Sequence, residues 1–144
     1  AVARSLMNRG DFQKLSQERL KDAEALLQKQ RYSGAYYLCG YVIECALKAC
    51  IAKQTQRFDF PPERKAVEAI YTHDLTKLFK SAGLEKDRDD DMKNDEKLKV
   101  YWSVLKQWTE ASRYEVCDQK KAQDIYQAIA DEKHGVLQWI SQRW

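Results

Sequence analysis

Hydrophobic side chains recur every three to four residues along most of the chain, which is the spacing of one buried face of an α-helix. The first such stretch runs from about Phe12 to Gln30, and polar side chains occupy its opposite face. Asp11, which follows Gly10, is suited to be the N-cap of this helix. Residues 30–34 then predict a short turn, so that the next helix runs antiparallel to the first.

The second stretch, from about Ser33 to Gln54, is apolar on nearly every side. Such a helix belongs at the centre of a bundle, where neighbours surround it. Gly40 predicts that a neighbouring helix approaches closely. The part from Ala35 to Ala52 is long enough to cross a membrane, but Glu44 and Lys48 near its middle would each cost about 2.5–3.5 kcal/mol at the bilayer centre. We therefore expect the central helix of a soluble bundle and no membrane contact.

A break follows the second helix. Two adjacent prolines within residues 58–62 stop it, and residues 63–71 predict no more than a helical turn or two. A short helix over 75–82 comes next, capped by Asp74 or Thr72 and ended by Gly83.

The C-terminal part predicts two longer helices. The first runs from about Asp95 to Ala111 and the second from its N-cap Asp118 to near the C-terminus, with Gly135 bending or interrupting it. Four apolar positions form one stripe of the first: Leu98, Tyr101, Leu105 and Trp108. The pattern as a whole predicts an all-α, up-and-down bundle of about five helices, with residues 1–10 as an N-terminal extension and 11–144 as a single domain.

Charged side chains dominate one segment, residues 85–97, which holds seven acidic and four basic residues. We expect an exposed, mobile loop there, leading into a helix. Asp87, Asp89 and Asp91 have the spacing of the first ligands of a calcium loop. However, Met92 and Leu98 stand where that loop requires a glycine and a bidentate glutamate, which argues against calcium binding.

Composition narrows the class of protein. A chain of 144 residues with five glycines and two prolines has too few turn residues for a β-sandwich or barrel. The net charge of +3 means that any nucleic-acid contact must come from local clustering. Four cysteines without a Cys-x-x-Cys pair predict buried, reduced thiols, and the first ten residues lack the apolar stretch of a secretion signal. We expect a cytoplasmic protein.

Signatures of catalysis are few. The two histidines, His73 and His134, accompany no recognisable nucleophile elbow, and the chain has neither a glycine-rich phosphate loop nor a His-Glu-x-x-His motif. No glutamate stands three residues before a histidine, as di-iron bundles require. We expect no metal, no cofactor and no residue with a catalytic role.

Two local features suggest binding. Glu44 and Lys48 are spaced so that their side chains meet on the second helix. They are either a mutually neutralising pair or two side chains that reach from the helix surface to water, or they lie on a groove for a polar ligand or a partner helix. Trp108, Arg113 and Tyr114 place an arginine beside aromatic rings, which suits a phosphate with a stacked base. Alternatively, the arginine satisfies carbonyls at a helix end and the rings belong to the core.

Several of these residues together resemble the opening of a HEPN domain. The most specific part is Tyr36 to Ala49, which follows the run Arg31-Tyr32-Ser33-Gly34. The later triplet His73-Asp74-Leu75, and Trp108 followed by Arg113-Tyr114, fit the same pattern. The resemblance covers roughly residues 11 to 140, nearly the whole chain.

Resemblance to this family implies a bundle of four to five helices that commonly forms dimers and associates with nucleotides or RNA. Many members are ribonuclease toxins or defence proteins, some of which pair with a small nucleotidyltransferase. Others are non-catalytic nucleotide-binding modules. The ribonuclease members carry an arginine, four to six further residues and then a histidine.

This chain departs from the ribonuclease motif. Four residues separate Arg113 from Asp118, and no histidine follows until His134, while eight residues separate Arg64 from His73. We therefore expect a homodimeric nucleotide- or RNA-binding module of prokaryotic type without the usual ribonuclease chemistry. The candidate binding residues are Arg113, Tyr114, Trp108, Glu44, Lys48, His73 and Asp118.

Two alternatives stay open. One is a rerouted ribonuclease toxin or defence protein that uses Arg113, Asp118 and His73. The other is an assembly module that pairs with itself or with a nucleotidyltransferase and binds no ligand.

Overall fold

The structure, a computed structural model, describes residues 7–55 and 64–144. These residues form eight α-helices and one 3-10 helix and no strand, which confirms the all-α class, although five helices were too few. The elements are α1 (Arg9–Gln28), α2 (Tyr32–Thr55), α3 (Arg64–Ile70), α4 (Leu75–Ser81), α5 (Glu85–Asn94), α6 (Glu96–Leu105), η1 (Glu110–Tyr114), α7 (Gln119–Ala130) and α8 (Val136–Ser141).

The N-cap of α1 differs from the prediction. Asn8, not Asp11, caps the helix: its side chain accepts a hydrogen bond from the Asp11 amide at 2.8 Å. The Asp11 carboxylate in turn accepts from the Asn8 amide at 3.0 Å, so the two residues form a reciprocal capping box. The helix therefore begins inside the stretch that we expected to be an extension.

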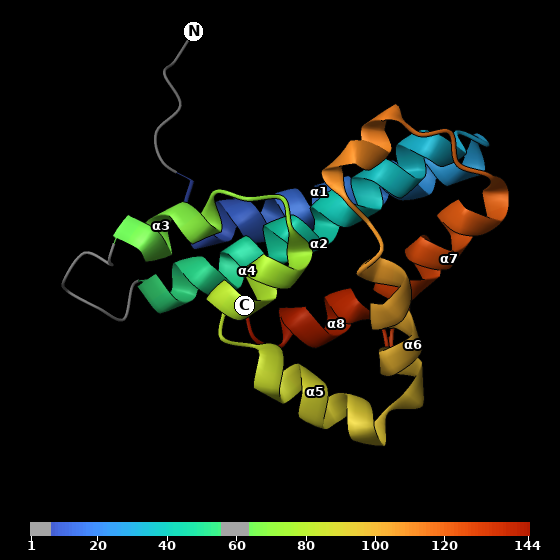
Figure 1. Ribbon diagram of the computed structural model, residues 1–144. Coiled ribbons are helices and arrows are strands. Elements are labelled where there is room, and N and C mark those ends of the chain that lie inside the picture. Colours follow the sequence, from blue (N-terminus) through green and yellow to red (C-terminus); the bar gives the residue numbers. More distant parts are fainter. Residues whose placement is uncertain (1–6, 56–63) are drawn as a thin grey trace, which may run out of the picture.

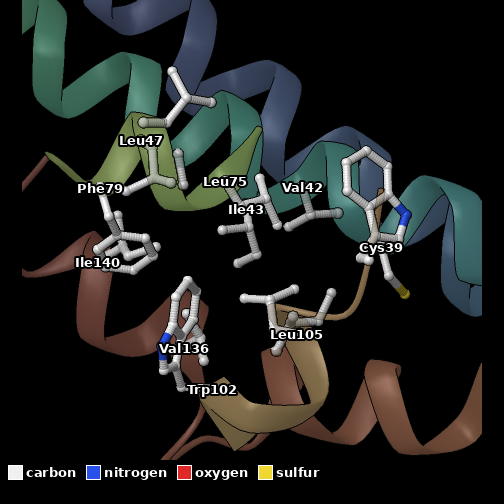
Figure 2. Packing of buried hydrophobic residues seen from close by; sticks show 14 of the residues in the cluster. Cys39, Val42, Ile43, Leu47, Leu75, Phe79, Trp102, Leu105, Val136 and Ile140 are labelled. Atoms are coloured by element: carbon white, nitrogen blue, oxygen red, sulfur yellow. The ribbon is translucent and has the colours of Figure 1, made fainter. Parts of the chain in front are cut away.

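Helix α2 is the centre of the bundle, as predicted. It contacts α1, α4, α7, α8 and η1, and it lies alongside α1 in Figure 1. Among the described residues, only α2 is long and apolar enough to cross a membrane, and 72% of its most apolar window is buried inside the fold. Figure 2 shows side chains from α2, α4, α6 and α8 gathered in the core, among them Ile43, Phe79, Leu105 and Ile140.

The four cysteines are free and buried, in agreement with the expectation of reduced thiols. Burial raises the pKa of Cys39 to about 12. It is also the largest of the effects that raise the pKa of Cys45 and Cys50 to about 11. These thiols are therefore protonated and poorly nucleophilic at neutral pH.

The prediction of an exposed loop at residues 85–97 is wrong. Residues 85–94 form α5, and the Arg88 side chain is buried with its guanidinium 4.9 Å from the Phe79 ring centre and 4.6 Å from that of Trp102. Asp91 accepts hydrogen bonds from Trp139 Nε1 at 2.8 Å and from Arg143 at 3.2 Å. The acidic composition suggested a solvated loop, but cation–π contacts, one ion pair and one hydrogen bond to Trp139 attach the helix to the bundle.

The predicted helix over 95–111 is also too long. Asp95 caps α6 by accepting from the Leu98 amide at 3.0 Å, and the helix ends at Leu105. The chain then turns, so that the Trp108 indole packs directly on Gly40 of α2. Gly40 thus admits a side chain from a loop, whereas the sequence predicted a neighbouring helix.

Other helix ends agree with the prediction. Asp74 caps α4, Gly83 follows it with a positive φ of 70°, and Asp118 caps α7. The last predicted helix is interrupted, because α7 ends at Ala130 and α8 begins after Gly135. The proline break at 58–62 lies outside the described residues.

Candidate functional site

A buried carboxylate on α2 organises the candidate site. Glu44 is only 5% exposed, and its Oε1 lies 2.6 Å from His73 Nδ1. Its other oxygen, Oε2, lies 3.6 Å from Lys48 Nζ, one helical turn further along α2. A buried carboxylate requires such partners, because desolvation without them would be costly. Glu44 thus orients the His73 ring, which stands directly before the start of α4.

The 3-10 helix η1 brings two further charges to His73. Glu110 Oε1 lies 3.5 Å from His73 Nε2 and 3.2 Å from Arg113 Nη1. One carboxylate oxygen therefore stands between an imidazole nitrogen and a guanidinium. We call Lys48, Glu44, His73, Glu110 and Arg113 the charged cluster. With His73 neutral, its formal charges sum to zero.

Three aromatic rings pack together next to the cluster, those of Tyr37, Tyr41 and Trp108. Tyr41 packs edge-on against both His73 and Trp108, with ring centres 5.8 and 5.6 Å apart. The hydroxyls of Tyr37 and Tyr41 are 2.9 Å apart. Burial, followed by the hydrogen bond to Tyr37, raises the pKa of Tyr41 well above its ordinary value, so the hydroxyl stays neutral.

Of the two rings expected to stack on a base, only one is accessible. Trp108 is 3% exposed, and its indole nitrogen is buried without a partner among the described residues. Tyr114 is 79% exposed, and the Arg113 guanidinium lies over its ring at 4.8 Å from the ring centre. Trp108 therefore belongs to the core, whereas Arg113 and Tyr114 face solvent.

A polar hollow of about 620 Å³ opens beside the cluster. Its lining includes Thr72, His73, Thr76, Lys106, Trp108 and Glu110. Hydroxyl, imidazole, ammonium and carboxylate groups thus line one space, together with apolar side chains, and they can form hydrogen bonds with a polar ligand. We call this space the His73 hollow.

The remaining two candidates, Lys48 and Asp118, do not line the His73 hollow. Lys48 lines a different, mostly apolar hollow of about 540 Å³ with Phe12, Ile51 and Ile70. Through its two oxygens, Glu44 thus contacts one lining residue of each hollow, His73 and Lys48. Asp118 accepts from the Lys121 amide at 2.8 Å as the cap of α7 and shares no contact with the cluster. Within residues 7–55 and 64–144, no three His, Cys, Asp or Glu side chains gather as metal ligands would.

A family model described as the HEPN domain matches residues 12–143. The chain belongs to the HEPN domain family. Membership relates the protein, at the level of the family, to nucleotide- and RNA-associated helical modules. Comparison with curated proteins and with solved structures gives no match.

Sequence reasoning missed Tyr37, Tyr41 and Glu110. The two tyrosines had a signal, because positions 37, 41, 44 and 48 recur at helical spacing and share one face of α2. No signal in the sequence pointed to Glu110, because the prediction placed this residue within a continuous helix. Only the end of α6 at Leu105 and the turn after it bring η1 to His73.

Proposed function

We propose that this HEPN domain binds the phosphate of a nucleotide or an RNA strand at the outer end of the charged cluster. One observation carries the proposal: Arg113 and His73, far apart in the sequence, meet at a single oxygen of Glu110 beside the His73 hollow. A guanidinium binds phosphate oxygens through two parallel hydrogen bonds, and the exposed ring of Tyr114 offers a surface for a base.

The chain lacks the usual ribonuclease motif of the family. No histidine follows Arg113 at the family's spacing, and Asp118 is engaged in capping α7. We therefore propose binding without the family's usual ribonuclease chemistry.

The test compares two arginine variants in a thermal-shift panel with mononucleotides, triphosphates and short single-stranded RNA. A ligand at about 100 times its dissociation constant stabilises a fold by about 2.7 kcal/mol, which amounts to several degrees here. We expect Arg113→Ala to abolish the shift. Arg64→Ala is the control, because Arg64 forms a comparable exposed pair with Glu68 at 3.0 Å but, unlike Arg113, makes no ion pair with a member of the charged cluster. Equal shifts in both variants would refute the proposal.

A second candidate function rests on the pair of His73 and Glu44. If Glu44 accepts from the Nδ1–H of His73, then Nε2, which faces Glu110 Oε1 at 3.5 Å, is the nitrogen that accepts a proton, as in a general base. In a rerouted ribonuclease, His73 would take the proton of an RNA 2′-hydroxyl, whose oxygen attacks phosphorus. The bond to the 5′-oxygen would break, that oxygen would be protonated by water, and a 2′,3′-cyclic phosphate would remain, while Arg113 holds the phosphate.

Incubation with end-labelled single-stranded RNA separates the two candidates. Cleavage that yields cyclic phosphate ends and is lost in His73→Ala, with binding retained, supports the enzyme. Binding without cleavage supports the module. Growth arrest on expression, relieved by Arg113→Ala, would indicate a toxin.

The homodimer, a nucleotidyltransferase partner and the cytoplasmic location stay predictions. Sedimentation, co-purification and cell fractionation test them. If no nucleotide or RNA binds, the assembly module is the better explanation, and the exposed side chains of Tyr114 and Val116 are where a protein contact is to be sought first.

A further inference from the structure

Glu110 occupies the position at which an anion is best held in this site. Its Oε1 accepts a hydrogen bond from Arg113 Nη1 at 3.2 Å and lies 3.5 Å from His73 Nε2. A carboxylate oxygen and a phosphate oxygen are alike in charge and in their capacity to accept from arginine. The place that Glu110 fills is therefore the place that a ligand phosphate would need.

The attachment of Glu110 is weak enough to be exchanged. The described residues give its carboxylate no partner besides His73 and Arg113, and the side chain is about one-third exposed. Glu110 is also the first residue of η1, a short 3-10 helix without a side-chain cap. An exposed ion pair of this kind is worth little, so the carboxylate can turn into solvent at small cost.

Glu44 provides the contrast within the same cluster. It is buried, with both oxygens engaged, at 2.6 Å from His73 and 3.6 Å from Lys48. Displacing Glu44 would leave a buried charge without its partners. Of the two carboxylates that face His73, only Glu110 is placed to leave.

We infer that Glu110 is a built-in competitor that closes the phosphate position until a ligand displaces it. This inference rests on the proposed function and adds its regulation. A phosphodiester group carries the same single negative charge as the Glu110 carboxylate, so exchanging one for the other leaves the net charge of the cluster unchanged. The site is therefore matched in charge to the linkage of a nucleic-acid strand.

The experiment measures the affinity of fluorescein-labelled single-stranded RNA by anisotropy, at one fixed ionic strength. Glu110→Gln keeps the shape of the side chain and removes its charge. We expect it to bind RNA roughly three- to tenfold more tightly than the native protein, because a negative charge no longer competes for Arg113. A dinucleoside monophosphate should displace the RNA from this variant at a correspondingly lower concentration.

Glu115→Gln is the matched control. Glu115 lies just after η1 and pairs with Lys121 at 3.7 Å, without contact to Arg113 or His73. It changes the net charge equally, so an equal gain in both variants would overturn the inference and indicate a general charge effect. Adding Arg113→Ala to Glu110→Gln should abolish the gain.

The outcomes separate the inference from the proposed function. If Arg113→Ala weakens binding while Glu110→Gln leaves it unchanged, the phosphate site stands and Glu110 is no competitor. If neither the native protein nor Glu110→Gln binds RNA or the dinucleotide, both are refuted.

Discussion

Gly40→Ala should destabilise this protein, although the same change stabilises most helices. Alanine is favoured over glycine within a helix by about 1 kcal/mol. At position 40, however, the added Cβ would lie 2.4 Å or less from three atoms of the Trp108 indole. Carbon atoms in contact are about 3.5–4.0 Å apart, so the ring would have to move by more than about 1 Å.

The size of the effect follows from the burial of Trp108. The indole is 3% exposed, and it packs on Gly40, Tyr37 and Tyr41 of α2. Losing the burial of a tryptophan side chain costs about 3–5 kcal/mol. Subtracting the gain in helix propensity leaves a net loss of about 2–4 kcal/mol. Because Trp108 precedes η1, the same displacement should move Arg113 away from His73 and weaken any phosphate binding.

Urea denaturation followed by circular dichroism measures this change, and an unchanged slope with denaturant shows that the unfolding stays comparable. In a Trp108→Ala background the ring is absent, so Gly40→Ala should become neutral or stabilising. Gly34→Ala is the control within the same helix, because its nearest neighbour is the flexible end of Leu26 at 3.3 Å. If Gly40→Ala is as stable as the native protein, or equally harmful in both backgrounds, the reasoning fails.

Two further predictions concern the fold. Hydrogen bonds from the backbone amides of His134 and Lys133, and from the Tyr101 hydroxyl, lower the pKa of Asp131 to about 2. A lowered pKa in the folded state means that the ionised carboxylate contributes stability in full above the unfolded value of about 3.9, and that this contribution is lost as the pH falls toward 2. Asp131→Asn should therefore lower the melting temperature at pH 6 and flatten its decrease between pH 4 and 2; parallel curves would contradict this. Arg88→Ala should destabilise the protein by about 1–3 kcal/mol and speed amide exchange across α5, since the packing on Phe79 and Trp102 is lost. The exposed Lys86→Ala should do neither, and equal exchange in the two variants would show that Arg88 does not hold α5.

Helix α5 shows where composition misleads. Ten residues with a predominance of charge look like a solvated loop, yet Leu84, Arg88 and Met92 are spaced four apart and share one helical face. Leu84 and Arg88 are buried, and Met92 packs against the core. The spacing of these three residues could be seen in the sequence. However, an arginine is expected on a buried helix face only when aromatic rings are known to pack against it, and the sequence does not show that.

The candidate site was predictable to the extent that it lies on one helix. Glu44 and Lys48 meet as their spacing indicates, because the rise and turn of a helix determine which positions are neighbours. The partnership of Glu44 with His73 could not be read from the chain, since it depends on how α4 packs against α2. The capping of α4 by Asp74 was predicted, and it explains why His73 precedes the helix without showing where its ring points.

By itself the sequence determined the all-α class, the central place of α2, the capping of α4 and α7, the burial of the thiols and the family, because these depend on local spacing and on the hydrophobic pattern. Only the tertiary structure decided that α6 ends at Leu105, that Trp108 fills the space above Gly40 and that Glu110 stands between His73 and Arg113. These features arise where segments distant in sequence compete for the same space and the same charges. Local propensity carries no information about that competition, and packing resolves it.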